Sequence, residues 1–269
     1  MNAVALGVLE AQCSLNPLYD EAYYGAIFSG EKLRGTAIMT PPYPFNINGD
    51  STDLVPHFVK MAKKFKRPHS VLGPGQFAKL FAKLWCEEMG CKISFEEAQA
   101  IHELKSVNHP HRSPGSSTTP NCSNSLYDDA VVRVAIESDR PLLTEWTTGF
   151  CIDCNMEEAL KDLEWHVSRT IKEKSRYLLL LEGKPVCMAG RARETKNGGT
   201  INWVYTPKLE RKKGFASRLV AKLSQNILDS GKSSVYLYTQ LNNPTSNKIY
   251  HDIGFRVICD SWHIRFNYE

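Results

Sequence analysis

The 269-residue chain lacks several features that would assign it to a specialised class of protein. No apolar run approaches the roughly 20 residues of a membrane-spanning helix. The apolar first residues, 1–9, have no basic flank and so do not resemble a secretory signal peptide. The net charge is only +4, too small to argue for binding to nucleic acid or to an anionic membrane. We therefore expect a soluble protein that binds neither.

The 8 cysteines do not show the spacing of a disulfide-rich secreted domain. We interpret them as reduced thiols, which predicts a cytoplasmic protein. Cys151 and Cys154 form a C-x-x-C motif that could be redox-active or half of a zinc site, and His109 and His111 could ligate a metal. Neither motif has further ligands at zinc spacing, so we predict no metal site and buried or half-buried thiols.

The most informative segment spans residues 201–221, where a strand, a basic loop and a helix are expected in succession. Residues 201–205 are β-branched and aromatic, as in a strand, and Pro207 should end the pairing of that strand. From Phe215 onward, apolar residues recur at helical spacing. Gly214 precedes this helix and would let a ligand approach the unbonded amides of its first turn.

Three cations, Arg211, Lys212 and Lys213, directly precede Gly214. Positive charge beside a helix N-terminus favours a phosphate or pyrophosphate ligand. The alternative is a basic surface loop without a ligand, and the spacing alone does not separate the two interpretations.

The remaining pattern alternates strands with helices and predicts a mixed α/β sheet. In the first half the expected elements are a hairpin (23–28 and 33–39), a helix (54–65), a strand (69–72), a helix (76–89) and an ambiguous segment (91–104). In the second half they are a strand (131–136), helices (138–150 and 156–171), a hairpin (177–181 and 186–194), and, after the central helix, a strand (234–239), a helix (243–252) and a strand (255–266).

Part of this order occurs in both halves, which indicates a duplicated unit. Residues 106–129 are rich in Ser, Pro, Asn and Thr and resemble a linker. We therefore predict an N-terminal domain at residues 1–105, a linker at 106–129 and a C-terminal domain at 130–269. The first copy has no basic loop before its helix, so we expect no anion site there.

Two motifs in the second half resemble the GNAT superfamily of acyl-CoA N-acyltransferases. The segment Val204-Tyr205-Thr206-Pro207, followed by Arg211-Lys212-Lys213-Gly214-Phe215-Ala216, is similar to the family's strand and its Arg/Gln-x-x-Gly-x-Gly/Ala pyrophosphate loop. The segment Asn243-Pro244-Thr245-Ser246, with Tyr250 and Gly254-Phe255, is similar to its Asn-x-x-Ala/Ser and Tyr-x-x-x-Gly-Phe motifs. The whole chain resembles a tandem subgroup with a degenerate first copy.

The resemblance implies a GNAT-like α/β fold and a set of ligand-binding residues. Those implied to bind acetyl-CoA are Val204, Tyr205, Thr206, Arg211, Lys212, Lys213, Gly214, Phe215, Ala216, Ser217 and Asn243. Tyr250 would protonate the departing thiolate, with packing as the alternative role. Asn243 could instead cap a helix, and Arg211 could bind phosphate or only shape the loop.

The implied function is an N-acetyltransferase that moves an acetyl group from acetyl-CoA, its co-substrate, to the amine of a small-molecule or amino-acid-like acceptor within a ternary complex. The alternative is a non-catalytic acyl-CoA-binding sensor or scaffold. No general base is evident, because the strand has Asn202 where the family often has a carboxylate. Glu145, Glu164, His166 and Glu194 are candidates by residue type only. We expect a monomer or homodimer.

Overall fold

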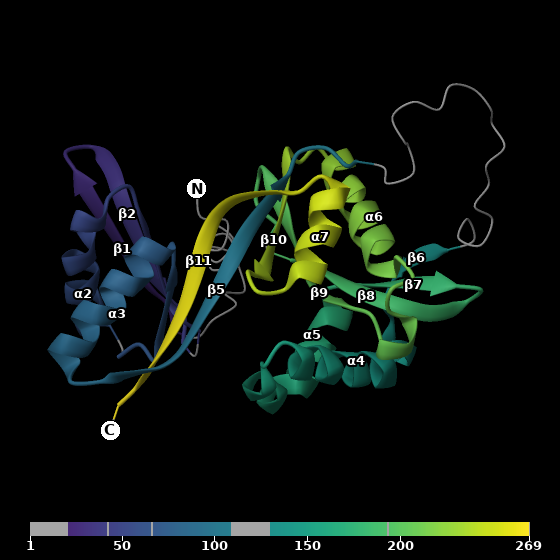
Figure 1. Ribbon diagram of the computed structural model, residues 1–269, viewed down its shortest axis with the longest axis horizontal. Helices are drawn as coiled ribbons and strands as arrows, with labels where there is room; N and C mark the ends of the chain where they lie inside the picture. Colours follow the sequence, from purple (N-terminus) through teal and green to yellow (C-terminus); the bar gives the residue numbers. More distant parts are fainter. Residues whose placement is uncertain (1–20, 42, 66, 109–129, 193, 269) are drawn as a thin grey trace. The chain divides into compact units, whose positions relative to one another are not determined.

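The computed structural model describes residues 21–41, 43–65, 67–108, 130–192 and 194–268 (Figure 1). Most of the predicted linker, with His109 and His111, lies outside the described residues. The chain divides into two compact units: unit 1 is Met1–His102, Tyr238–Pro244 and Val257–Glu269, and unit 2 is Glu103–Leu237 and Thr245–Arg256. None of the described helices is both long and apolar enough to cross a membrane.

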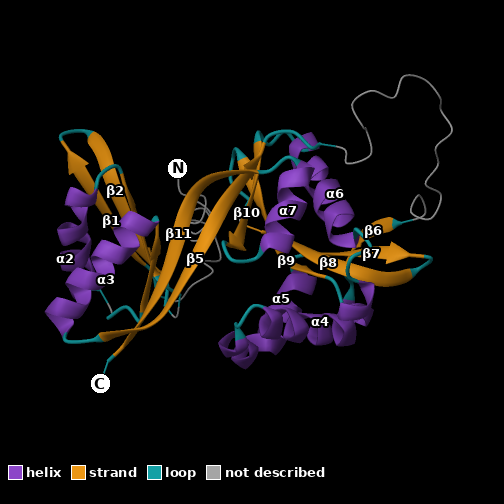
Figure 2. Cartoon of the chain, in the orientation of Figure 1, coloured by secondary structure: helices purple, strands orange, loops and turns teal. Residues whose placement is uncertain are grey.

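Unit 1 is an α/β unit that begins with the predicted hairpin, whose turn contains Gly30 at a φ of +59°. Its elements in chain order are β1 (Tyr23–Ser29), β2 (Lys32–Met39), β3 (Phe45–Gly49), α2 (Val55–Lys64), β4 (Ser70–Gly73), α3 (Gly75–Met89), β5 (Lys92–Leu104) and β11 (Arg256–Asn267). Figure 2 shows α2 and α3 side by side, and they contact each other. The core between the helices and the sheet is aromatic, with Phe45, Phe58, Phe77, Phe81 and Trp85 buried.

The sheet of unit 1 has the strand order β1-β2-β3-β4-β11-β5. The last strand of the chain, β11, pairs antiparallel with β4, and Ile264 lies opposite Val71. Both side chains are fully buried in the unit 1 core. The C-terminal strand therefore completes the sheet of the N-terminal unit, whereas the predicted boundaries group it with the second copy. The division of the chain into two sequence copies stays a prediction.

Unit 2 contains the strand, basic loop and helix of residues 201–221. Its elements are β6 (Val131–Val134), α4 (Arg140–Asp153), α5 (Leu163–Lys172), β7 (Arg176–Leu181), β8 (Lys184–Ala192), β9 (Gly198–Tyr205), α6 (Phe215–Asp229), β10 (Ser234–Gln240) and α7 (Pro244–Ile253). The strand order is β10-β9-β8-β7-β6. Strands β6 to β9 are antiparallel neighbours, whereas β9 and β10 are parallel. The predicted mixed α/β sheet is thus confirmed.

Different helices cover the two sides of the unit 2 sheet. Successive residues of a strand point to opposite sides, so neighbouring residues belong to different cores. Leu179 and Cys187 belong to the core that also contains residues of α6 and α7. Leu178 and Met188 belong to a second core, which contains residues of α4 and α5. The sheet therefore has α6 on one face and the α4–α5 pair on the other.

Three segments differ from the sequence-based expectations or resolve them. The ambiguous segment forms strand β5 over Lys92–Leu104, since burial alternates at Ala100, His102 and Leu104. Strand β3 was not predicted: its asparagines are disfavoured in strands, although Phe45 and Ile47 are buried. The helix expected at 156–171 is wrong in its first part, where Glu157–Asp162 is a 3₁₀ segment. None of its described side chains is buried, so no apolar face favours an α-helix there.

Candidate active site

Strand β9 contains a β-bulge shortly before its end. Tyr205 lies opposite Met188 and Asn202 opposite Gly190, so β9 has two residues between these pairs where β8 has one. Within this bulge Trp203 has a φ of +51°, in the left-handed region that non-glycine residues rarely adopt. Such bulges re-aim side chains, and strained residues cluster at functional sites. The bulge thus marks the end of β9 as a candidate site.

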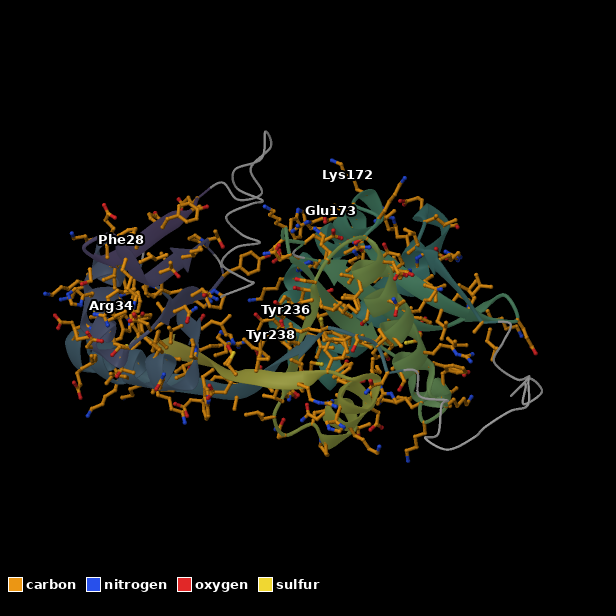
Figure 3. All side chains as sticks on the ribbon, turned by 90° about the horizontal axis from the view of Figure 1, so that it is seen from above. Phe28, Arg34, Lys172, Glu173, Tyr236 and Tyr238 are labelled. Carbon is orange, nitrogen blue, oxygen red and sulfur yellow. The ribbon has the colours of Figure 1, made fainter. Side chains whose placement is uncertain are left out.

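The same part of β9 extends beyond its pairing with β10. Among the described residues, this parallel pairing ends where Thr200 lies opposite Tyr236, which Figure 3 labels. Strand β9 continues to Tyr205, and Pro207 follows, as the sequence predicts. Residues 204–206, which the resemblance assigns to the pantetheine arm, lie in this stretch.

A one-turn 3₁₀ segment, Lys208–Glu210, connects β9 to the basic loop. The Arg211 Nε–H donates a hydrogen bond to the Thr206 carbonyl oxygen at 2.9 Å. The Arg211 guanidinium also forms an ion pair with Asp153 at the end of α4 and lies 5.7 Å from the centre of the Tyr205 ring. These contacts favour the loop-shaping role of Arg211 over direct phosphate binding.

Helix α6 begins at Phe215, as predicted, and Gly214 is its N-cap. Gly214 has a φ of +78°, and a Cβ built on it would meet no atom within 4 Å. The first bond within the helix runs from the Arg218 N–H to the Gly214 carbonyl oxygen at 3.1 Å. The amides of Ala216 and Ser217 precede it and point out of the helix end. The structure thus provides an open space beside backbone donors.

Local charge at this helix end is partly neutralised by acidic neighbours. Lys213 donates to Glu210 at 3.0 Å, and Arg211 is paired with Asp153. Lys212 is exposed, has a φ of +64° and forms no ion pair among the described residues. The positive potential available to an anion therefore comes from Lys212 and from the helix dipole.

The Tyr250 side chain is 8% exposed and lies on α7. Its ring packs edge-on against Phe255 at 6.0 Å between centroids. Burial raises the pKa of the Tyr250 hydroxyl, and the thiols of Cys187 and Cys154 act in the same direction. The hydroxyl therefore stays protonated at neutral pH. This arrangement suits both the packing role and the proton-donor role.

Cys187 on β8 links these two parts of the site, and no motif in the sequence points to it. The Thr206 hydroxyl donates to its sulfur at 3.3 Å. Burial raises the pKa of the Cys187 thiol to about 12, so the group is neutral. Cys187 and Tyr250 also belong to one hydrophobic core, so the end of β9 and Tyr250 are connected through the same buried side chain.

The structure brings most of the predicted site residues together within unit 2, with one exception. Asn243 belongs to unit 1, where its N–H donates to the Gln240 carbonyl oxygen at 3.1 Å. Its proposed contact with the cofactor stays a prediction. Cys151 is buried and Cys154 half-buried, both as free thiols, in agreement with the predicted burial of this motif.

The candidate bases differ in their surroundings. Glu164 and Glu194 each form an ion pair with an arginine, and Glu145 is exposed on α4. His166 is half-buried on α5, with its ring 5.8 Å from that of Trp203 in the bulge. Burial is the main cause that lowers the pKa of His166, which keeps its ring neutral at pH 7. Of these four residues, His166 is the one whose ring contacts a ring of β9.

Residues 180–264 match the family model described as FR47-like protein. This range, about a third of the chain, includes the bulge, the basic loop, α6 and Tyr250. A comparison with curated proteins gave no match.

Solved structures of similar fold cover both units of the chain. A GNAT-family acetyltransferase from Colwellia psychrerythraea is 10% identical, with a TM-score of 0.54 over 98% of this chain and 95% of the other. A GCN5-related N-acetyltransferase from Kribbella flavida is 10% identical, with a TM-score of 0.57 over 99% of this chain and 94% of the other.

The chain therefore has the GNAT fold, which confirms the predicted fold class. The FR47-like match, over residues 180–264, concerns part of this fold.

Proposed function

We propose that this protein is an N-acetyltransferase that moves the acetyl group of acetyl-CoA to the amine of a small-molecule or amino-acid-like acceptor. The observation that carries the proposal is the start of α6 after Gly214, where a short basic loop joins this helix to a bulged strand that extends beyond its pairing with β10. The proposal includes a cytoplasmic location, in keeping with the free thiols described above.

The residues present fit a coenzyme A molecule. The open space at Gly214 and the amides of Ala216 and Ser217 suit the pyrophosphate, and Lys212 adds positive charge. The backbone of residues 204–206 would pair with the pantetheine arm along the free side of β9. Arg211 would hold the loop in shape through Thr206 and Asp153.

The reaction then requires a hydrogen-bond donor to the thioester carbonyl oxygen and an acid that protonates the departing thiolate. The neutral amine attacks the thioester carbon, a C–N bond forms, and an amide near Thr206 stabilises the oxygen that gains negative charge. The C–S bond breaks, and the departing thiolate takes the proton of the Tyr250 hydroxyl, which is later replaced by the proton lost from the amine through solvent. An acceptor amine of low pKa needs no dedicated base.

The alternative function is a non-catalytic acyl-CoA-binding module. One observation favours it: β9 has Asn202 and Trp203 in its bulge, and no carboxylate occurs in this strand. Such a module would bind coenzyme A through the same loop but would not catalyse acetyl transfer.

The two functions are separated by measuring binding and turnover on the same preparation. Calorimetry with acetyl-CoA should give saturable one-site binding. Release of free thiol from acetyl-CoA should then rise above the hydrolysis background with members of a panel of amines and amino acids. Binding without acceptor-dependent thiol release across that panel supports the module, and absence of binding contradicts both functions.

A further inference from the structure

Arg176, the first residue of β7, has an unusual environment for an arginine. Its side chain lies on the face of the sheet that is covered by α4 and α5, because it alternates in the same way as Leu178. The residue is only 2% exposed. Arginine remains charged in proteins, and a buried charge is costly unless an opposite charge and hydrogen bonds compensate it.

Within the described part of the chain, Arg176 has no carboxylate partner. Its guanidinium makes one hydrogen bond, from one terminal nitrogen to the Trp203 carbonyl oxygen at a long 3.5 Å. It also lies 5.3 Å from the centre of the Trp203 ring. The guanidinium has five N–H donors, so most of its hydrogen-bonding capacity is left for another group.

The neighbouring titratable groups do not supply the missing negative charge. Burial raises the pKa of the Cys151 thiol and lowers that of the His166 ring, so both are neutral at pH 7. Burial also lowers the pKa of Arg176 to about 9, which still leaves it protonated. A single buried positive charge therefore remains uncompensated by the residues that surround it.

The position above Gly190, beside this guanidinium, is occupied by the side chain of Asn202. Arg176 on β7 lies opposite Gly190 on β8, which in turn lies opposite Asn202 on β9. A Cβ on Gly190 would lie 2.3 Å from the Asn202 Oδ1 atom and 3.4 Å from a terminal nitrogen of Arg176. The guanidinium and the carboxamide thus approach each other above a glycine, and a side chain at residue 190 would displace the carboxamide from this position.

This row of residues is adjacent to the proposed site of acetyl transfer. Asn202 and Trp203 belong to the bulge of β9, and residues 204–206 follow directly. The Trp203 ring contacts Phe150 of α4 at 4.8 Å and His166 of α5 at 5.8 Å between centroids. The Arg176 guanidinium therefore lies beside this group of aromatic rings and next to strand β9, along which the thioester would be held.

We propose that Arg176, with Asn202 above Gly190, binds the carboxylate of the acceptor, so that the acceptor is an amino acid rather than a simple amine. This inference rests on the proposed function, because it assigns the other substrate of the same site. A carboxylate matches the planar guanidinium with two parallel hydrogen bonds. Its single negative charge balances the single positive charge of Arg176, which a phosphate dianion would exceed.

The test compares each amino acid with its own amide, for example glycine with glycinamide and phenylalanine with phenylalaninamide. The wild-type chain should prefer the acid of a pair in kcat/KM. Arg176→Gln should raise the KM for the acid by about 10–100-fold and leave that for the amide almost unchanged. Arg169→Gln is the matched control, since Arg169 is an α5 arginine paired with Glu173.

Two further measurements keep the outcomes distinct. Titration of the coenzyme A-loaded chain with the amino acids reports acceptor binding without turnover, so failure of catalysis and failure of carboxylate binding are separable. Arg176→Lys and Gly190→Ala serve if Arg176→Gln fails to fold, and both should lose the preference for the acid. A folded Arg176→Gln chain with an unchanged acid-to-amide ratio overturns the inference, as does a wild-type preference for amides or simple amines.

Discussion

The Arg211 side chain is bonded to the carbonyl oxygen of Thr206, five residues earlier in the chain, at 2.9 Å. This bond closes the segment between β9 and α6 into a fixed loop, and the ion pair to Asp153 holds the loop against α4. The shape of the proposed pyrophosphate site thus depends on an arginine that is already engaged on both sides.

Asp153→Asn should weaken coenzyme A binding by about 2–5-fold, because loss of a partly exposed ion pair loosens the loop by up to about 1 kcal/mol. Calorimetric titration with coenzyme A measures the change. Glu173→Gln, which breaks the exposed pair with Arg169 on α5, is the control and should leave the affinity unchanged; Figure 3 labels Glu173. Tighter binding by Asp153→Asn would instead mean that the released Arg211 contacts the phosphates.

Gly214→Ala should weaken coenzyme A binding by about tenfold or more, since a Cβ there projects into the space proposed for the pyrophosphate. Gly183 in the β7–β8 turn is a matched control, because it has a φ of +76° and a Cβ built on it would also meet no atom within 4 Å. Both alanine variants should lose about 1 kcal/mol of stability from the left-handed backbone. Equal coenzyme A affinities of the two variants would argue against the pyrophosphate site.

Tyr250→Phe should lower kcat by about 10²–10⁴-fold if the hydroxyl protonates the departing thiolate. Coenzyme A affinity should stay the same, because the ring and its contact with Phe255 are retained. Tyr236→Phe, which removes a hydroxyl bonded to Glu103 at 3.2 Å, is the control and should keep the wild-type kcat. If the Tyr250→Phe variant keeps the wild-type kcat, the role of Tyr250 is packing and not proton transfer.

Ile264→Ala should destabilise unit 1 by about 2–5 kcal/mol, because it leaves a cavity in a fully packed core. Hydrogen exchange should accelerate in β4 and β11, whose residues pair directly, and change less in α6 of unit 2. Acceleration confined to unit 2, with β4 unchanged, would contradict the completion of unit 1 by β11.

Stability should fall as the pH is lowered from about 6.5 to 4, because of His263. Its pKa is lowered from 6.5 to about 4, first by burial and then by the charges of Arg265 and His69. Its Nε2 atom has no hydrogen-bond partner among the described residues. In that pH range the unfolded chain binds a proton that the folded chain does not, so the contribution of His263 to stability is fully present above pH 6.5 and is lost as the pH falls toward 4.

The linked loss is up to about 3 kcal/mol and is measurable by denaturant unfolding at several pH values. His263→Phe should flatten this pH dependence, whatever its effect on stability at pH 7. His251→Gln, at an exposed position of α7, should not. An unchanged slope for His263→Phe would assign the acid sensitivity to other groups.

Sequence reasoning succeeded where the signal is local. The hairpins, the helix that begins at Phe215 and the glycine before it follow from turn residues and from apolar spacing over a few positions. The bulge at Trp203 could not be predicted in this way, since it depends on the register of β9 with β8. The same holds for the strand order, which is set by pairing between residues far apart in the chain.

The candidate site shows the same division between local and distant information. Gly214 and Tyr250 lie within motifs. In contrast, the contact between Asp153 and Arg211 joins residues 58 positions apart in the sequence, and the contact between Cys187 and Thr206 joins residues 19 positions apart. Arg176 carries no sequence signal at all, because its importance comes from burial without a counter-charge. Only the assembled sheet reveals that.

The pairing of β4 with β11 has a consequence for the order of events during synthesis. Ser70 meets its partner Arg265 only after some two hundred further residues have been translated. Until then the growing N-terminal unit exposes the side of β4 that β11 will cover, and an exposed strand edge is a target for unwanted association. On the ribosome, the sheet of this unit therefore cannot be completed until β11 has been synthesised.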